Sequence, residues 1–251
     1  MPKTRDALRD PDTKREINRD LFDRIARRYD LITRILSLGR DSSWKRSLVA
    51  QLPEEAPEVC LDLATGSGDI AALLAERYQS ATIRALDLSS EMISVAQRRL
   101  PSERYEFTCG DIDRLPYPDE SADLVTGGYA LRNVPDLGRA LAQIHRVLKP
   151  GGSAFFLDFV QPPRGVKRVV QHMLLNIWGS LVGLLIHCRP STYRYIPQSL
   201  TNYPPRQELQ DLFEKAGFEI LGRKSHFFGI MERQELRKPS GAPPGGKPLA
   251  A

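Results

Sequence analysis

Cysteine is scarce in this sequence of 251 residues. The three present, Cys60, Cys109 and Cys188, are odd in number and lie in apolar surroundings. This pattern excludes the disulfide framework of a small secreted domain and the clustered ligands of a metal site, so we expect reduced cysteines in or near the core. Residues 1–20 are charged and lack an apolar stretch, which excludes a secretory signal peptide there. These absences predict a cytoplasmic protein without a bound metal.

The sequence also lacks long runs of charge of a single sign. The formal net charge is +5 and the sequence pI is about 9.2, but the basic residues are scattered through helical patterns beside acids. No basic stripe with interleaved aromatic residues supports a nucleic-acid partner, whereas an anionic membrane surface fits this charge. No internal repeat is present. A hydrophobic fraction of 41% and a charged fraction of 27% are typical of one globular domain.

The chain divides into three parts. Residues 1–14 form a charged N-terminal tail, residues 15–236 form the domain, and residues 237–251, which are rich in proline and glycine, are predicted to be disordered. Within the domain, residues 164–203 are predicted to form a helical lid inserted beside the substrate.

Alternating strand and helix patterns indicate the fold. Two N-terminal helices, over residues 15–37 and around 44–52, come before the alternation. Predicted strands lie at 59–63, 82–87, 105–108, 124–127 and 153–159, with helices at 69–78, 91–100 and 137–148. A helix at 206–216 and a hairpin of strands at 218–224 and 227–233 close the domain. This order predicts an α/β fold with a doubly wound, mostly parallel, seven-stranded Rossmann-like sheet, which binds ligands outside the carboxyl ends of its strands.

A glycine-rich turn follows the first predicted strand. Residues 61–71 read LDLATGSGDIA, in which Gly66, Gly68 and Ala71 satisfy the pattern G-x-G-x-x-G/A. Glycines allow the backbone to approach a ligand closely, and the next helix offers free N–H groups. Asp62 lies inside the first strand, where it can hold a cationic amino group. Asp87 ends the second strand and is placed to accept both hydroxyls of a ribose, in a dinucleotide or in another nucleoside cofactor.

The following segments distinguish these cofactors. DLSSEMISVAQRRL, over residues 87–100, combines an acid, a capping serine and an apolar methionine, and CGDIDRLPYPDESADLV, over residues 109–125, places Asp111 where it can accept from an adenine amino group. With RVLKPGGSAFFLDF at residues 146–159, they resemble the class I S-adenosylmethionine-dependent methyltransferases. A nicotinamide-dependent oxidoreductase is the rival, but it requires a Tyr-Lys or His constellation that is not clearly present.

Three further segments narrow the family. They are LFDRIARRYDLITRILSLGRDSSWKR, GGYALRNVPD and STYRYIPQSLTNYPPRQELQDLFEKAGFE, at residues 21–46, 127–136 and 191–219. These segments resemble the ubiquinone/menaquinone biosynthesis C-methyltransferases. The resemblance implies methylation of a ring carbon on an isoprenoid-tailed benzoquinol or naphthoquinol. Another phenolic substrate and a non-catalytic accessory subunit remain alternatives, as do a homodimer and a quinone-biosynthesis complex.

The resemblance also implies site residues. Its cofactor contacts fall on Ser67, Asp87, Asp111, Ile112 and Gly128, to which the turn adds Asp62, Gly66 and Gly68. Gly128 stands where the family commonly has serine, so a contact there can involve only the backbone.

The catalytic candidates follow the fourth and fifth strands. Arg132 is expected to stabilise a developing phenolate, with Asn133 as its hydrogen-bonding partner. Asp158 is expected to face the same cleft, as a base or as a residue that holds a loop. Tyr29 either closes the pocket from the N-terminal helix or packs there.

Residues 169–188, VVQHMLLNIWGSLVGLLIHC, have about the length of a membrane span. However, polar or small residues follow one helical stripe, which indicates an amphipathic helix. They are His172, Asn176, Ser180, Gly183 and His187. Arg164, Lys167, Arg168 and Arg189 flank it. Two interpretations remain open: a buried helix packed on the sheet, or a lid whose apolar face receives the isoprenoid tail or enters the bilayer interface, which would make the protein peripheral at the inner face of a membrane.

Overall fold

The computed structural model describes residues 10–162, 165–187 and 195–241. It contains a seven-stranded sheet in the order β3-β2-β1-β4-β5-β7-β6. The strands are β1 Val59–Leu63, β2 Thr82–Asp87, β3 Tyr105–Cys109, β4 Ala122–Gly128, β5 Leu148–Phe159, β6 Glu219–His226 and β7 Met231–Arg237. Neighbouring strands from β3 to β5 are parallel, and β7 is antiparallel to both of its neighbours. The predicted doubly wound sheet with a terminal hairpin is confirmed.

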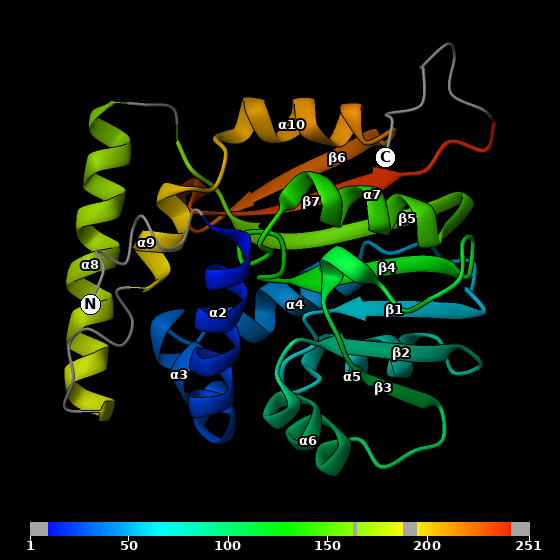
Figure 1. The fold of residues 1–251 in the computed structure, drawn as a ribbon, viewed down its shortest axis with the longest axis horizontal. Coiled ribbons are helices and arrows are strands. Elements are labelled where there is room, and N and C mark those ends of the chain that lie inside the picture. Colours follow the sequence, from blue (N-terminus) through cyan, green and yellow to red (C-terminus); the bar gives the residue numbers. More distant parts are fainter. Residues whose placement is uncertain (1–9, 163–164, 188–194, 242–251) are drawn as a thin grey trace.

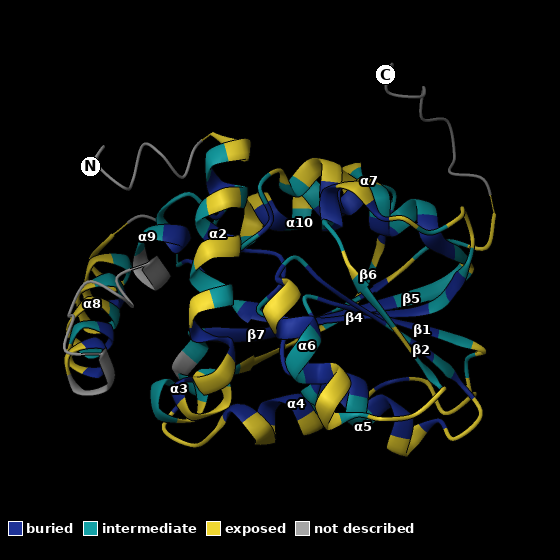
Figure 2. Cartoon of the chain, turned by 60° about the horizontal axis from the view of Figure 1, so that its bottom comes forward, coloured by how far each residue is buried: buried dark blue, intermediate teal, exposed yellow. Residues whose placement is uncertain are grey.

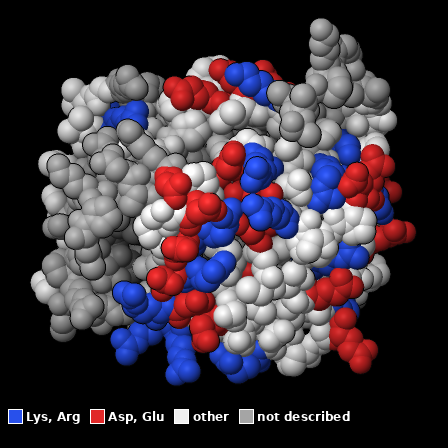
Figure 3. Space-filling view, viewed as in Figure 1, with Lys and Arg blue, Asp and Glu red and all other residues white. Residues whose placement is uncertain are grey.

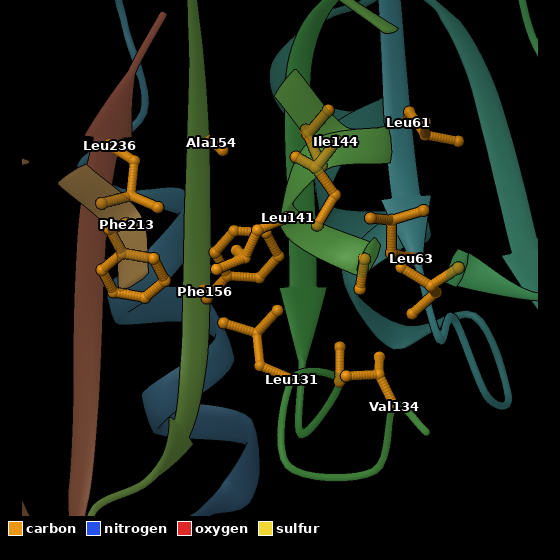
Figure 4. Close-up of a cluster of buried hydrophobic side chains, with 14 of the residues drawn as sticks. Leu61, Leu63, Leu131, Val134, Leu141, Ile144, Ala154, Phe156, Phe213 and Leu236 are labelled. Atoms are coloured by element: carbon orange, nitrogen blue, oxygen red, sulfur yellow. The ribbon is translucent and has the colours of Figure 1, made fainter. Parts of the chain in front are cut away.

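Helices cover both faces of the sheet (Figure 1). They are α4 Asp41–Val49 and α5 Asp69–Arg77 on one face, α7 Leu137–Val147 and α10 Arg206–Lys215 on the other, and α6 Ser90–Arg99 near the β2–β3 edge. The apolar residues of α7 recur with helical spacing, so Ala140, Leu141, Ile144 and Val147 all face the sheet and are buried. Figure 4 shows this cluster, in which Leu141 and Ile144 meet Phe156 of β5. A second cluster fills the α4–α5 side, and Figure 2 shows the central strands buried between the helical layers.

Several boundaries differ from the sequence prediction. Helix α2, Pro11–Ile25, begins inside the predicted tail because Asp10 caps it by accepting from the Thr13 N–H at 2.8 Å. A short 3₁₀ turn then separates α2 from α3, Tyr29–Leu36. The strand expected at 227–233 was placed too early: Phe227–Gly229 form a 3₁₀ turn, with Gly229 at φ +82°, and β7 begins at Met231.

The cysteine prediction is confirmed for one of three residues. Cys60 is buried in β1 and unpaired. Cys109 is exposed at the end of β3, so the expected position in or near the core is wrong for this residue. Cys188 lies outside the described residues. Figure 3 shows basic and acidic side chains interleaved over the centre of this face, with basic side chains gathered along its lower edge. Over residues 10–162, 165–187 and 195–241, no cluster of three or more His, Cys, Asp or Glu side chains is arranged to hold a metal ion.

Helix α8, Val166–His187, stands at the edge of the molecule beside α9, Tyr195–Thr201, and α3 (Figure 1). Trp178 anchors it by donating from Nε1 to the Leu36 carbonyl oxygen at 3.2 Å. Within the described chain, none of the helices has the length and apolar character needed to cross a bilayer. Of the two interpretations left open for this segment, the helix buried on the sheet is contradicted, because one side of α8 is open to solvent (Figure 2).

Candidate functional site

A cavity of about 500 Å³ lies at the carboxyl ends of the central strands, where the sequence predicts a ligand site. Its floor comes from the loops after β1, β2, β3, β4 and β5, and α2, α3 and α8 form the remaining walls. A small second cavity adjoins the glycine turn and shares Tyr29, Ala64 and Gly128 with the first. Ten of the twelve predicted site residues line one or both cavities: Tyr29, Asp62, Gly66, Ser67, Asp87, Asp111, Ile112, Gly128, Arg132 and Asn133.

The glycine turn has the backbone conformation that close approach to a ligand requires. Gly66 and Gly68 adopt φ values of +57° and +87°, in the left-handed region that favours glycine. A Cβ atom at Gly68 would lie 2.7 Å from Leu100 Cδ1, so the turn packs tightly against the end of α6. Gly68 itself does not line either cavity, and its contribution is to the conformation of the turn. Helix α5 begins at the next residue and presents its free N–H groups there.

Asp87 is held rigidly at the end of β2. Its Oδ2 accepts from the Gly66 N–H at 2.8 Å, and its Oδ1 accepts from the Ser89 N–H at 2.9 Å. Each oxygen keeps a second lone pair, so the carboxylate can still accept from two ribose hydroxyls. Burial raises the pKa of Asp87 to about 6.

Asp62, which is predicted to hold a cationic amino group, lines the small cavity. Its carboxylate accepts from the hydroxyls of Thr65 at 2.6 Å and Thr126 at 2.8 Å. Burial raises the pKa of Asp62 to about 6. A nearby ammonium would compensate this buried charge.

Asp111, which the sequence predicts to accept from an adenine amino group, has a partner that the sequence did not indicate. The Asp111 carboxylate accepts from the Asp113 N–H at 3.1 Å and forms an ion pair with Arg15 of α2. Ser67 donates its hydroxyl to Asp30 Oδ1 at 2.5 Å, so this hydroxyl is engaged by α3. A Cβ atom at Gly128 would lie 2.8 Å from Ile70 Cδ1, which agrees with a backbone-only contact there.

Arg132 is the buried cation of the cavity. Its Nη1 donates to Asn133 Oδ1 at 3.1 Å and to Ser199 Oγ at 2.8 Å, and its guanidinium lies 5.0 Å from the centre of the Phe159 ring. The Nε donor has no hydrogen-bond acceptor among the described residues. Arg132 lines the cavity and its guanidinium carries five N–H donors, so it can donate to an anionic oxygen there, but it cannot take a proton.

Asp158 does not face the cavity, so that expectation is wrong. It lies beneath Arg132, 2% exposed, and does not belong to the cavity lining. Its carboxylate accepts from the backbone N–H groups of Arg132 at 3.1 Å and Phe159 at 2.8 Å, and lies 3.6 Å from Arg132 Nε. Burial raises the pKa of Asp158. Of the two roles predicted for it, the geometry supports holding the loop.

Tyr29 lies where the N-terminal helix meets the glycine turn. Its ring carbon Cε1 is 3.4 Å from the Cβ position of Gly66, so the ring covers the turn. Burial raises the pKa of Tyr29 to about 12, which keeps its hydroxyl protonated near neutral pH.

Helix α2 supplies two contacts to the Arg132 loop that the sequence analysis did not find. The Lys14 ammonium donates to the carbonyl oxygens of Arg132 at 3.2 Å and Val134 at 2.6 Å, and Asn18 Nδ2 donates to the Asn133 carbonyl oxygen at 2.6 Å. Burial lowers the pKa of Lys14 to about 8. No sequence signal marked these residues, because they lie in a charged segment far from the loop along the chain.

Comparisons with known proteins agree with this geometry. The sequence pattern of the ubiE/COQ5 methyltransferase family matches residues 11–235. The chain is 37% identical to the demethylmenaquinone methyltransferase of Thermus thermophilus over 202 residues, which are 80% of this chain and 92% of that protein. It is 35% identical to the ubiquinone/menaquinone biosynthesis C-methyltransferase UbiE of Desulfotalea psychrophila, covering 84% of this chain and 86% of that protein.

Solved structures share the fold at lower identity. An S-adenosylmethionine-dependent methyltransferase from Mesorhizobium loti gives a TM-score of 0.57 at 19% identity, covering 78% of this chain and 97% of that chain. A similar enzyme from Aquifex aeolicus gives 0.55 at 16% identity, covering 77% and 89%. The sheet, the cavity and the match over residues 11–235 lead to one conclusion: this chain belongs to the ubiE/COQ5 methyltransferase family.

Proposed function

We propose that this protein transfers the methyl group of S-adenosylmethionine to a ring carbon of an isoprenoid-tailed quinol. One observation carries the proposal: a single cavity is lined by Asp87, Asp111 and Arg132 together with a large set of apolar side chains. The apolar lining includes Ile25, Ile32, Leu36, Trp44, Leu175 and Trp178. The names of the relatives, demethylmenaquinone methyltransferase and UbiE, support a quinol head group.

The protein residues perform a positioning task. When bound, S-adenosylmethionine supplies an already activated methyl group, so the ring carbon has only to be aligned with it. Asp87 and Asp111 fit its ribose and adenine, and Asp62 fits its amino group. A phenol ionises near pH 10, so ionisation at neutral pH needs a shift of about 3 pKa units, or about 4 kcal/mol. A nearby arginine contributes about 1–3 of these units, and Arg132 is placed to provide it.

We expect the purified protein, given S-adenosylmethionine and a tailed demethylnaphthoquinol under anaerobic conditions, to add one methyl group to the ring. Mass spectrometry with fragmentation distinguishes a C-methyl product from an O-methyl product. A product methylated only on oxygen would favour the alternative of another phenolic substrate. Cofactor binding without any turnover on benzoquinols and naphthoquinols would favour the accessory subunit instead.

The proposal includes contact with an anionic membrane surface through α8. Eight large apolar side chains of this helix are between 40% and 79% exposed: Val166, Val169, Val170, Met173, Leu174, Ile177, Leu181 and Leu184. Leu174 and Ile177 also line the cavity, so the exposed face continues into the site. Lys167 and Arg168 lie at the start of the helix, where they fit anionic headgroups. A tailed substrate could then enter directly from the lipid. Arg164, Arg189 and the side chain of His187 lie outside the described residues.

Replacing Ile177 and Leu181 by glutamate is expected to weaken binding to anionic vesicles by at least about tenfold, because each change removes an apolar group worth about 1.5–3 kcal/mol from the contact. Co-sedimentation with phosphatidylglycerol-containing vesicles measures this effect, and added salt should weaken binding by the parent protein. Leu221→Glu is the matched control, since Leu221 is 48% exposed on β6, away from the cavity. Equal binding by all three proteins would contradict membrane contact. A parent dimer that the double variant dissociates, without vesicle binding, would make the face a contact between two copies.

A further inference from the structure

Tyr129 occupies an unusual position in the cavity wall. It is a non-glycine residue at φ +58°, a conformation that side-chain-bearing residues rarely adopt outside constrained sites. Its N–H donates to the Leu157 carbonyl oxygen at 2.7 Å, and its carbonyl oxygen accepts from Asn133 Nδ2 at 2.9 Å. The backbone is therefore fixed on both sides, and the ring is held against the cavity.

The direction of the Tyr129 hydroxyl is set by a buried ion pair. Tyr129 Oη donates to Asp41 Oδ1 at 2.6 Å, while Lys45 lies 2.7 Å from Asp41 Oδ2 and 2.8 Å from Asp69 Oδ2. A carboxylate paired with lysine only accepts hydrogen bonds, so Asp41 accepts one from the tyrosine O–H, and the lone pairs of Oη remain for other partners. Burial raises the pKa of Tyr129 well above its usual value, so the hydroxyl remains protonated near neutral pH.

Tyr129 and Arg132 both lie near the same aromatic ring, Phe159. The Tyr129 and Phe159 ring centres are 6.0 Å apart, and the Arg132 guanidinium lies 5.0 Å from the centre of the Phe159 ring. Tyr129, Arg132 and Phe159 all line the cavity, so its wall near Phe159 carries a hydroxyl oxygen that can accept a hydrogen bond and a guanidinium that can only donate. A 1,4-quinol carries two oxygens on opposite sides of its ring, of which one can be ionised while the other keeps its proton.

We propose that Tyr129, oriented by Asp41 and Lys45, accepts a hydrogen bond from the second ring hydroxyl and makes the site selective for the reduced quinol over the oxidised quinone. The inference rests on the proposed function and adds a specificity-determining residue to it. A quinone carbonyl has no proton to donate. In a buried site, the lone pairs of its oxygen would therefore face the lone pairs of Tyr129 Oη. An unsatisfied polar contact of this kind is the usual basis for rejecting an analogue.

Calorimetry with protein saturated with S-adenosylhomocysteine tests this inference, because no turnover then consumes the ligand. The probes are 1,4-naphthohydroquinone, kept reduced under anaerobic conditions, and 1,4-naphthoquinone. We expect the parent protein to bind the reduced probe at least about tenfold more tightly than the oxidised one. Tyr129→Phe should reduce this ratio to about one, mainly by weakening binding of the quinol.

Asp41→Asn provides the second variant, since its amide can donate to Oη and free the tyrosine proton to bind a carbonyl. It should strengthen quinone binding relative to the parent, an effect that loss of packing alone would not produce. Tyr105→Phe, on the edge strand β3, is the control and should keep the parent ratio. A parent ratio retained in folded Tyr129→Phe, or no preference in the parent, would overturn the inference. Failure of the parent to methylate any quinol would instead contradict the proposed function.

Discussion

Replacing Arg132 by glutamine is expected to lower turnover on a quinol substrate by about 100-fold, comparable to the loss of a donor that stabilises a developing oxyanion. The glutamine amide can still donate a hydrogen bond, but it cannot stabilise a phenolate by charge. Arg132→Lys keeps the charge and loses the planar arrangement of donors that now reaches Asn133 and Ser199, so turnover should still fall by at least about tenfold. Steady-state kinetics with saturating cofactor measures both effects.

The control for this prediction is the cofactor site. Arg132 contacts none of Asp62, Asp87 and Asp111 through a hydrogen bond, so S-adenosylmethionine affinity should stay within about twofold of the parent for both variants. Thermal unfolding checks stability, because glutamine at position 132 leaves the buried Asp158 carboxylate without its cation. Unchanged turnover in either folded variant would remove Arg132 from the mechanism.

Asp87→Ala is expected to weaken S-adenosylmethionine binding by about 1–3 kcal/mol, because the ribose hydroxyls would lose their acceptor in a buried site. The Gly66 N–H would lose its acceptor as well, which loosens the glycine turn. Calorimetry on the folded variant measures the affinity. Affinity equal to that of the parent, or tight binding of NAD, would contradict the cofactor assignment at this residue.

The pH dependence of binding offers an independent check on Asp87. The charged form accepts from the ribose hydroxyls, and the pKa of about 6 means that protonation removes this form as the pH falls below 6. Affinity should therefore decrease from pH 7 to pH 5, by up to about tenfold per pH unit for this group. The Asp87→Asn variant should bind S-adenosylmethionine more weakly at pH 7, and its affinity should decrease less between pH 7 and pH 5. Protonation of Asp62 accounts for the decrease that remains.

The fold was predictable because its signals are local. Alternating apolar segments marked β1 and β2 with their observed bounds, and the capping residues Ser89 and Asp136 mark the starts of α6 and α7. The end of the domain was less predictable: the strand expected from residue 227 was displaced because Gly229 adopts a positive φ that its neighbours in the sequence do not reveal.

The site was predictable where strand ends converge and not where side chains meet across the fold. Asp87 ends β2 and Asp111 closely follows the adjacent parallel strand β3, so the topology alone brings them together. Asp158 also follows this rule, but a strand residue points to either side, and its carboxylate turns beneath Arg132 rather than into the cavity. The Arg15–Asp111 and Tyr129–Asp41 pairs join segments with no shared local pattern, so only the assembled chain shows them.

The contacts of α2 have a consequence for how the chain acquires its structure. Lys14, Arg15 and Asn18 bind partners that lie between 96 and 120 residues further along the sequence. Because a chain emerges from the ribosome N-terminus first, α2 is synthesised long before Asp111, Arg132, Asn133 and Val134 exist to receive it. Contacts this distant close large loops and form slowly. Helix α2 is therefore expected to be among the last elements to pack, and the Arg132 loop to reach its final arrangement only when that early helix returns to it.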